Sequence, residues 1–376
     1  MTKRPQPGIC MASVFLLLAL SPSSLIAQAK AKSAEKHLLY VAVPGIRDYV
    51  EYGGHGILVF DIDNGHKFVK RIASSGVDEK GHALNVKGVC ASSKTHRLYI
   101  STTRTLSCFD LISEKLLWEK PYDRGCDRMA ISPDGQVIYL PSLESDHWHV
   151  VNAINGEVIK KIVPRSGAHN TLMSLDGHYA YLAGLKSPIL RVSDANVHEV
   201  VREIGPFGNK IRPFTINGRH TRCYVNVNEL LGFEIGDLET GKVLSHTEVK
   251  NFEKGPVKRH GCPSHGVGLT PDETEIWLTD AFNKRLHIFD NRVDPPKQVD
   301  SILLRDEPGW ITFGIDGKFA YPSTGDVIDT RSQKIIADLT DETGAAVQSE
   351  KLLEIDFANG EPIRAGNQFG VGRVEN

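Results

Sequence analysis

The sequence predicts an all-β protein, a seven-bladed β-propeller whose blades are four-stranded antiparallel sheets. Three observations support this prediction. A strand–turn–strand pattern recurs along the chain, a third and a fourth strand follow each copy, and helical periodicity of useful length is absent after residue 29. Units of about 40–45 residues with four strands each are typical of propeller blades.

The repeat joins a short apolar strand, a turn centred on Asp or Asn, and a strand with a central aromatic residue. The closest copies are MAISPDGQVIYLPS (129–142), TLMSLDGHYAYLAG (171–184), VGLTPDETEIWLTD (267–280) and WITFGIDGKFAYPST (310–324). Pro-Asp-Gly chemistry suits tight turns between antiparallel strands. Third strands such as RLHIFD and fourth strands such as EVIKKIVP are short and rich in β-branched residues, as expected of strands.

The two ends of the repeat region complement each other. The first unit begins at HLLYVAV (37–43), which matches a second strand, so its innermost strand is missing. The segment EKLLEIDFANG (350–360) supplies one additional strand. We predict that this C-terminal strand joins the first blade and closes the ring without a free sheet edge. The predicted propeller spans 37–360, and the glycine-rich residues 361–376 are expected to form an irregular tail.

The N-terminal segment, residues 1–29, has the layout of a secretory signal peptide. Lys3 and Arg4 precede an apolar run at 11–20, and Ala27-Gln28-Ala29 offers a small-residue cleavage site. The apolar run is too short to span a bilayer, and no later stretch is apolar enough to do so. We therefore expect cleavage near Ala29, a short linker at 30–36, and an exported, monomeric protein in the periplasm or outside the cell.

The composition is that of an ordinary globular protein, with 40% hydrophobic and 24% charged residues. The formal net charge is -2 and no block of like charge stands out, which argues against an extended nucleic-acid surface. Five cysteines follow residue 29, so an exported protein would keep at least one unpaired thiol. One internal disulfide remains open, and Cys126 with Cys262 is a conceivable pair.

The segment SHGVGLTPDETEIWLTDAFNKRLHIFD (264–290) resembles the YVTN-type repeat, in which a His-Gly pair and an apolar strand precede a Ser/Thr-Pro-Asp turn. The chain from 37 to 360 is similar to the YncE-like family of exported seven-bladed propellers. This resemblance implies the fold and leaves the activity open, because members of that family serve different functions.

Aligning the units on their turn residues places one residue of each unit at the start of its innermost strand, at one mouth of the axial channel. These residues are Lys87, Asp127, His169, Lys210, His265 and Gly309. In the family that the sequence resembles, a His at this place commonly braces a turn or a neighbouring blade. The alternative is that these positions bind a polar or anionic ligand, with Lys87, Arg128, Lys210 and Arg212 as donors.

Further candidates for this mouth are Asn170, His260 and Trp310. His260 and Cys262 lie outside the repeat register in a long loop, so they are either a weak ligand pair or part of a surface loop with a buried thiol. Trp310 either stacks on a ligand or plugs the channel as part of the core. Asp127, His169 and His265 are candidate ligands of a divalent cation, although Lys87 and Lys210 would raise its electrostatic cost.

The chain contains no nucleophile elbow, no zinc-binding His-Glu-x-x-His helix and no phosphate-binding loop motif. The sequence therefore favours a binding scaffold over an enzyme, with a small polar or anionic ligand, a glycan or a protein partner at one axial mouth. The alternative is a propeller hydrolase, lactonase or lyase that uses the axial Asp and His residues, with or without a metal. We predict no cofactor beyond that optional divalent ion.

Overall fold

The computed structural model of the chain describes residues 1–5, 8, 35–74 and 76–375. The predicted apolar run, the cleavage site near Ala29, most of the linker and Cys10 lie outside these residues. Within the described part of the chain, no helix is both long and apolar enough to cross a bilayer.

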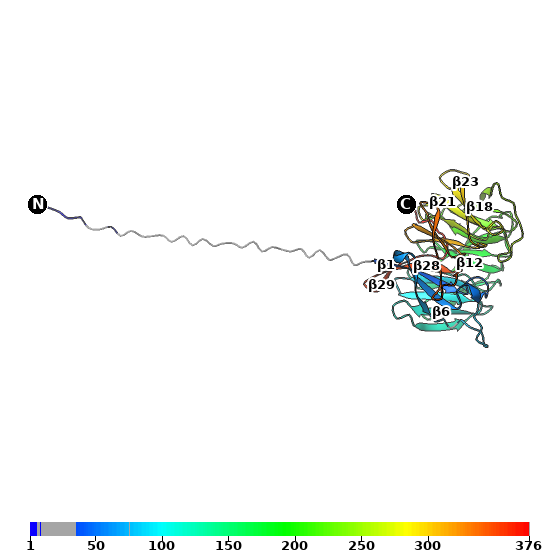
Figure 1. Cartoon of the computed structure of the whole chain (residues 1–376), viewed down its shortest axis with the longest axis horizontal. Helices are drawn as coiled ribbons and strands as arrows, with labels where there is room; N and C mark the ends of the chain where they lie inside the picture. The colour runs from blue at the N-terminus through cyan, green and yellow to red at the C-terminus, as the bar shows by residue number, and fades with distance from the viewer. Residues whose placement is uncertain (6–7, 9–34, 75, 376) are drawn as a thin grey trace. The chain divides into compact units, whose positions relative to one another are not determined.

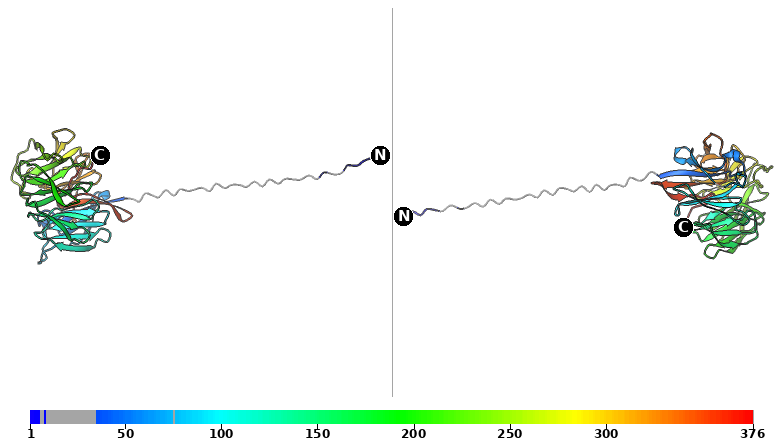
Figure 2. Two further views of the ribbon diagram at one scale, coloured as in Figure 1. Left: turned by 180° about the vertical axis from the view of Figure 1, so that it is seen from behind. Right: turned by 90° about the horizontal axis from the view of Figure 1, so that it is seen from below.

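Seven antiparallel sheets surround a common axis, as the sequence predicts (Figures 1 and 2). The first sheet combines both ends of the propeller: β1 Glu35–Val43, β2 Gly56–Asp61, β3 Lys67–Ile72, β28 Leu352–Ala358 and β29 Glu361–Ala365. The second and third sheets comprise β4 Val86–Ser92, β5 Arg97–Thr102, β6 Thr105–Asp110, β7 Leu116–Pro121, then β8 Ala130–Ile131, β9 Val137–Pro141, β10 Trp148–Asn152 and β11 Val158–Ile162.

The remaining four sheets follow in chain order. The fourth and fifth comprise β12 Ala168–Met173, β13 Tyr179–Gly184, β14 Leu190–Asp194, β15 Glu199–Ile204, then β16 Ile211–Ile216, β17 Arg222–Val227, β18 Gly232–Asp237 and β19 Val243–Glu248. The sixth and seventh comprise β20 Val267–Leu269, β21 Glu275–Asp280, β22 Arg285–Asp290, β23 Lys297–Leu303, then β24 Ile311–Phe313, β25 Phe319–Pro322, β26 Asp326–Asp329 and β27 Lys334–Asp338. Two single-turn 3-10 helices, η1 Val50–Tyr52 and η2 Ile62–Asn64, interrupt the first blade.

The C-terminal strand closes the ring, which confirms the prediction. Strand β28 pairs antiparallel with β1, with Leu38 opposite Ile355 and Tyr40 opposite Leu353. Strand β29 pairs with the other edge of β28, so the first sheet has five strands where the others have four. The expected irregular tail is thus wrong for residues 361–365, which form a strand because β28 offers them an unpaired edge.

The central aromatic residue of each second strand is buried between blades and explains the repeat. These residues are Tyr40, Tyr99, Tyr139, Tyr181, Tyr224, Trp277 and Tyr321, all at most 2% exposed. Several of the hydroxyls reach the following blade: that of Tyr99 donates to the carbonyl of Ala153 at 2.9 Å, and that of Tyr139 pairs with His198 at 2.7 Å. A buried Tyr needs such a partner for its hydroxyl, so this position joins neighbouring sheets.

Residues 366–374 lie across the central channel. The side chain of Gln368 donates to the carbonyl of Met129 at 2.9 Å and accepts from the backbone N–H of Val89 at 3.1 Å. The carbonyl of Gly370 accepts from the N–H of Leu269 at 2.9 Å. These partners belong to different blades, so the segment plugs the channel. A Cβ at Gly370 would lie 2.7 Å from the Cα of Gly268, so only glycine fits there.

Candidate functional site

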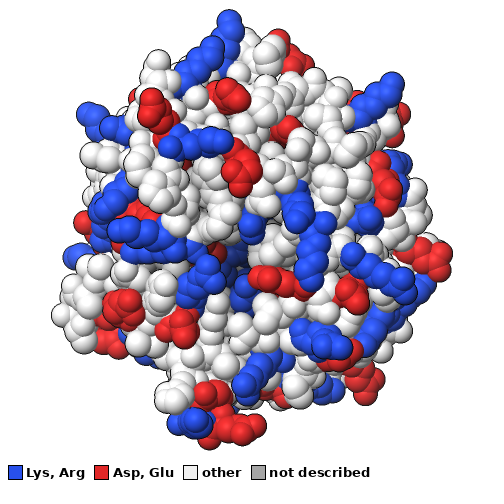
Figure 3. All heavy atoms as spheres, turned by 90° about the vertical axis from the view of Figure 1, so that its right-hand side faces the viewer, with Lys and Arg blue, Asp and Glu red and all other residues white. Residues whose placement is uncertain are grey.

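A cavity of about 480 Å³ lies at the mouth where the innermost strands begin, a size typical of small-molecule sites. It is lined by Ile46, Arg47, Asn85, Lys87, Asp127, Arg128, Glu144, His169, Leu185, Lys186, Lys210, Arg212, Asn228, Arg259, His260, Gly261, His265, Glu350 and Lys351. Eight of these residues are Lys or Arg and three are Asp or Glu. Figure 3 shows Lys and Arg side chains gathered around a hollow near the centre of one face of the molecule.

Arg128 forms the base of this cavity and rests on a plugged channel. Its guanidinium carbon lies 3.5 Å from the centre of the Trp310 ring. The indole N–H of Trp310 donates to the carbonyl of Gln368 at 2.6 Å, and the ring packs against Phe369 with centroids 5.1 Å apart. The C-terminal segment thus supports Trp310, and Trp310 in turn supports Arg128.

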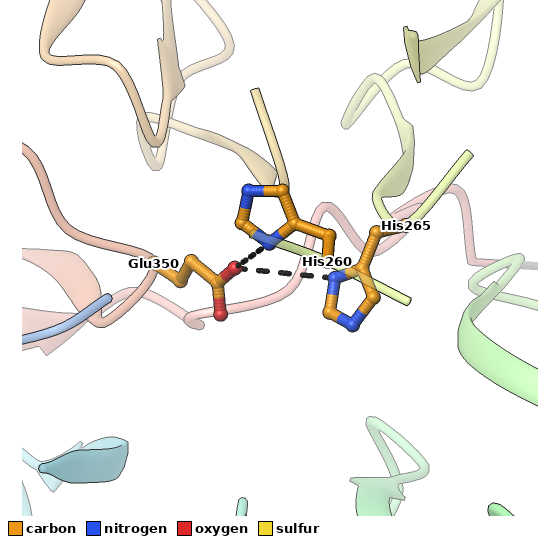
Figure 4. A group of neighbouring side chains, drawn as sticks. All are labelled: His260, His265 and Glu350. Atoms are coloured by element: carbon orange, nitrogen blue, oxygen red, sulfur yellow. Dashed lines mark ion pairs between the residues drawn. The ribbon is translucent and has the colours of Figure 1, made fainter. Parts of the chain in front are cut away.

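Glu350 is the acidic centre of the cavity base (Figure 4). Its Oε1 accepts from Nδ1 of His260 at 3.0 Å and lies 3.9 Å from Nδ1 of His265. Its Oε2 accepts from Arg128 at 2.9 Å and from Lys351 at 2.6 Å. Burial alone would raise the pKa of Glu350, but the charge of Lys351 and the hydrogen bond from His260 hold that pKa well below its usual range. Glu350 is therefore a carboxylate held by cationic neighbours.

A second buried pair forms one wall of the cavity. Nδ1 of His169 lies 2.7 Å from Oδ2 of Asp127, and the Lys87 ammonium lies 3.4 Å from the other carboxylate oxygen. Burial would raise the pKa of Asp127, but His169 and Lys87 lower it below the ordinary value. Burial lowers the pKa of His169 despite the nearby carboxylate. A neutral His169 oriented by Asp127 keeps Nε2 as an acceptor.

The outer part of the cavity carries cations without acidic partners. Within the described ranges, Arg47, Lys186, Lys210 and Arg212 form no ion pair. Arg47, Lys186 and Lys210 are exposed at the rim, whereas Arg212 is half-buried. Nε of Arg212 donates to the side chain of Asn228 at 2.6 Å, which fixes the direction of its guanidinium. The mouth therefore has an uncompensated positive charge.

Comparison with known proteins leaves the family open. No protein-family model matches the chain, and no curated protein matches it. One similar solved structure is hydrazine synthase of Kuenenia stuttgartiensis, with a TM-score of 0.45 and 16% sequence identity over 69% of this chain and 98% of that chain. A structural similarity this weak gives no information about the function of this chain. The resemblance to the YncE-like family is not confirmed by these comparisons.

The structure brings most of the predicted mouth residues into one cavity lining. These are Lys87, Asp127, Arg128, His169, Lys210, Arg212, His260 and His265. His260 lies outside the repeat register, yet its loop folds inward and buries the ring against Gly309 and Glu350. The loop is exposed over much of its length and carries the buried thiol of Cys262, as one of the two interpretations expects, but it also buries His260 against Glu350.

Two of the residues predicted to bind a ligand, Trp310 and Asn170, lie outside the lining. Trp310 is buried beneath Arg128, so it plugs the channel and does not stack on a ligand, because its indole is large enough to fill the axis. Asn170 is 1% exposed, and neither polar atom of its side chain has a hydrogen-bond partner among the described residues. It lies beside Arg128 through a parallel backbone bridge.

Glu350, Lys351 and Arg259 are site residues that the sequence reasoning missed. Glu350 stands two residues before β28, as His265 stands two residues before β20. Counting back from the start of the predicted C-terminal strand, instead of from a turn residue, would have found it. Arg259 comes from the irregular loop before β20 and pairs with Asp306 at 2.7 Å. No repeat signal marks a residue in such a loop.

The ligand set predicted for a metal does not come together. His265 lies beside His260 and Glu350, and the ligand atoms of these three fall within 4.8 Å of one another. Asp127 and His169 pair with each other elsewhere on the wall. Nδ1 of His265 already donates to the carbonyl of Gly309 at 2.9 Å, and Glu350 already binds Arg128 and Lys351. A divalent cation would meet the fixed positive charge of Arg128 and would have to displace these hydrogen bonds, so this group fits a cation poorly.

The described cysteines carry no disulfide. Cys90, Cys108, Cys126, Cys223 and Cys262 are all free and buried. The conceivable bridge between Cys126 and Cys262 is thus absent from the described residues. Burial raises the pKa of Cys262 to about 12, which makes it a poor nucleophile at neutral pH.

Proposed function

We propose that this chain is an exported, YncE-like propeller that binds a small anionic molecule in the cavity at the axial mouth. The observation that carries the proposal is the set of four cations at the mouth, Arg47, Lys186, Lys210 and Arg212, that have no carboxylate partner in the described chain. A concave site that is rich in unpaired cations attracts anions and excludes cations.

The donors at the base support the same ligand class. Nη2 of Arg128 binds Glu350, whereas Nε and Nη1 are buried without a partner among the described atoms. Buried donors of this kind are normally satisfied, and a guanidinium fork matches the two oxygens of a carboxylate or phosphate. An anion that enters between the rim and Arg128 would therefore meet donors at both levels.

The test is calorimetric titration of the purified protein with citrate and with inorganic phosphate, with glucose as an uncharged comparison. We expect saturable binding of at least one anion and none of glucose. The double variant Lys210→Ala/Arg212→Ala should weaken anion binding by about tenfold or more, because charge-assisted hydrogen bonds are lost.

The matched control for this double variant is Arg219→Ala. Arg219 is an exposed cation in the hairpin between β16 and β17, at the opposite end of the innermost strand that carries Arg212. Its removal should leave anion affinity unchanged. Equal weakening by both variants, or the absence of any anion binding, would contradict an anion site at this mouth.

A second candidate function is hydrolysis of a small anionic ester or lactone. The Asp127–His169 pair supports it, because a carboxylate that orients a neutral imidazole at 2.7 Å is a common arrangement of a general base. Assay of a lactone and ester panel tests this candidate. Activity that survives in both Asp127→Asn and His169→Gln would rule out this pair as the catalytic base.

A further inference from the structure

We propose that Lys351 is a covalent binding residue whose amine condenses with the carbonyl group of a small 2-oxo acid held in the axial cavity. The anionic half of this ligand rests on the proposed function above. The carbonyl half is a separate inference, which follows from the position and partners of one nitrogen atom.

The Lys351 amine is held in one place by two acceptors. Nζ donates to the carbonyl of Gly45 at 3.0 Å and to Oε2 of Glu350 at 2.6 Å. Lys351 lines the cavity, although it is only 4% exposed overall. An uncharged amine has two N–H bonds and one lone pair, so two acceptors use both hydrogens and leave the lone pair free. No third partner of Nζ occurs in the part of the chain that the structure describes.

The surroundings favour the uncharged amine. Burial and the charge of Arg128 lower the pKa of Lys351 to about 7, although Glu350 opposes this effect. An exposed lysine is almost fully protonated at neutral pH and cannot attack a carbonyl. A buried lysine next to a second cation is the environment in which enzymes produce a nucleophilic amine.

The neighbours also suit the other end of a 2-oxo acid. Arg128 and Lys351 contact the same oxygen of Glu350, at 2.9 Å and 2.6 Å, so the guanidinium lies close to the amine. Two nitrogens of Arg128, Nε and Nη1, remain without partners among the described atoms. In a 2-oxo acid the carboxylate is bonded directly to the carbonyl carbon, so a nearby fixed guanidinium can hold it while the amine attacks that carbon.

The condensation is balanced without any additional reactant. The lone pair of Nζ forms a C–N bond to the carbonyl carbon, and the carbonyl oxygen takes a proton to give a carbinolamine. That oxygen then leaves as water with both former amine hydrogens, and a C=N bond replaces the C=O bond. Nδ1 of His260 lies 3.0 Å from Oε1 of Glu350, so the carboxylate orients the imidazole that transfers these protons.

The experiment traps the imine by reduction. The full-length protein is incubated with pyruvate or 2-oxoglutarate, treated with borohydride, digested and mapped by mass spectrometry. We expect one stoichiometric adduct at Lys351, with at least tenfold less at the exposed Lys210. Trapping should rise as the pH increases through about 7, because the amine then loses its proton.

The controls separate covalent from ionic binding. Lactate and 2-hydroxyglutarate have the same charges without the carbonyl, so they should bind in calorimetry and leave no adduct. Lys351→Arg replaces the amine with a guanidinium that cannot form this imine, so it should give no adduct with pyruvate. Mapping the wild-type protein needs no variant, so misfolding of Lys351→Arg would not obscure the result.

Two different failures are distinguishable. If lactate and pyruvate both bind but Lys351 carries no adduct, the imine is overturned and the anion site stands. If none of the four acids binds, the anion site fails and the imine fails with it. Adducts spread over exposed lysines without enrichment at Lys351 would also overturn the inference.

Discussion

At the scale of single residues, a large pKa shift occurs away from the cavity, in β28. Glu354 and Asp356 are both almost fully buried on this strand. Oε2 of Glu354 accepts from the N–H of Ile315 at 2.7 Å, and Oδ2 of Asp356 lies 2.8 Å from Nε of Arg364. Burial raises the pKa of Glu354 to about 8, and the charge of Asp356 adds to this effect. Glu354 is thus a protonated acid at neutral pH.

This position predicts a pH dependence of stability. The folded protein holds a proton on Glu354 that the unfolded chain releases above about pH 4.5, so this residue's contribution is fully present below that pH and is lost as pH rises to about 8. Glu354→Gln keeps an acceptor for Ile315 and removes the titration. Its melting temperature should exceed that of the wild type by about 2 °C or more at pH 8 and match it near pH 4.5.

Thermal unfolding monitored by circular dichroism between pH 4.5 and 9 measures this difference. Glu239→Gln, at an exposed turn position, is the matched control and should follow the wild type at every pH. A constant offset between Glu354→Gln and the wild type across the range would show that Glu354 does not titrate in this window.

Residue positions inside the repeat were predictable from sequence, and those outside it were not. The turn alignment located Lys87, Asp127, His169 and His265 because each lies the same number of residues before the turn of its hairpin. Glu350 escaped because β28 leads into β29 without a turn residue at the same offset. The partners of each charged residue depend on how separate loops meet at the axis. The spacing of residues along one sequence does not show how close such loops come in the folded structure.

At the scale of elements, the C-terminal segment after β29 behaves as part of the core. Phe369 is 3% exposed and packs against Trp310 and Phe214, with ring centroids 5.1 and 6.5 Å apart. Its glycine-rich sequence has neither alternation nor helical periodicity, which is why an irregular tail was expected. Burial of this segment is a consequence of the channel that receives it, and local propensity does not reveal it.

Phe369→Ala should lower the free energy of unfolding by about 3–5 kcal/mol, because it leaves a cavity beside the two buried rings of Trp310 and Phe214. The control Ile363→Ala, on the exposed face of β29 in the same C-terminal segment, should cost about 0.5 kcal/mol or less. Urea denaturation followed by Trp fluorescence measures both. Equal small losses in the two variants would show that the plug contributes little to stability.

At the scale of the whole molecule, the distribution of charged residues says more about the mouth of the channel than the net charge does. The chain has a formal net charge of -2, yet eight of the residues that line the mouth are Lys or Arg against three Asp or Glu. Composition alone therefore suggested no charged surface. The concentration of positive charge arises only when the ring brings residues far apart in the sequence to one end of the axis.

This distribution predicts that anion binding depends on ionic strength. Because salt screens the exposed rim cations, raising NaCl from about 0.05 to 0.5 M should weaken citrate binding by about tenfold. Titration at several salt concentrations measures the slope. The slope should be shallower in Lys210→Ala/Arg212→Ala and unchanged in Arg219→Ala. Citrate affinity that is indifferent to salt would place the anion away from the charged rim.

Closure of the first sheet by β28 has a consequence for synthesis of the protein. Glu350 and Lys351 directly precede β28 and leave the ribosome after every other residue of the cavity lining. A nascent chain that lacks them has neither the acidic centre of the base nor the strand that joins the ring. The cavity lining is thus completed in one late step, and a prematurely terminated product lacks both its acidic base and the closing strand.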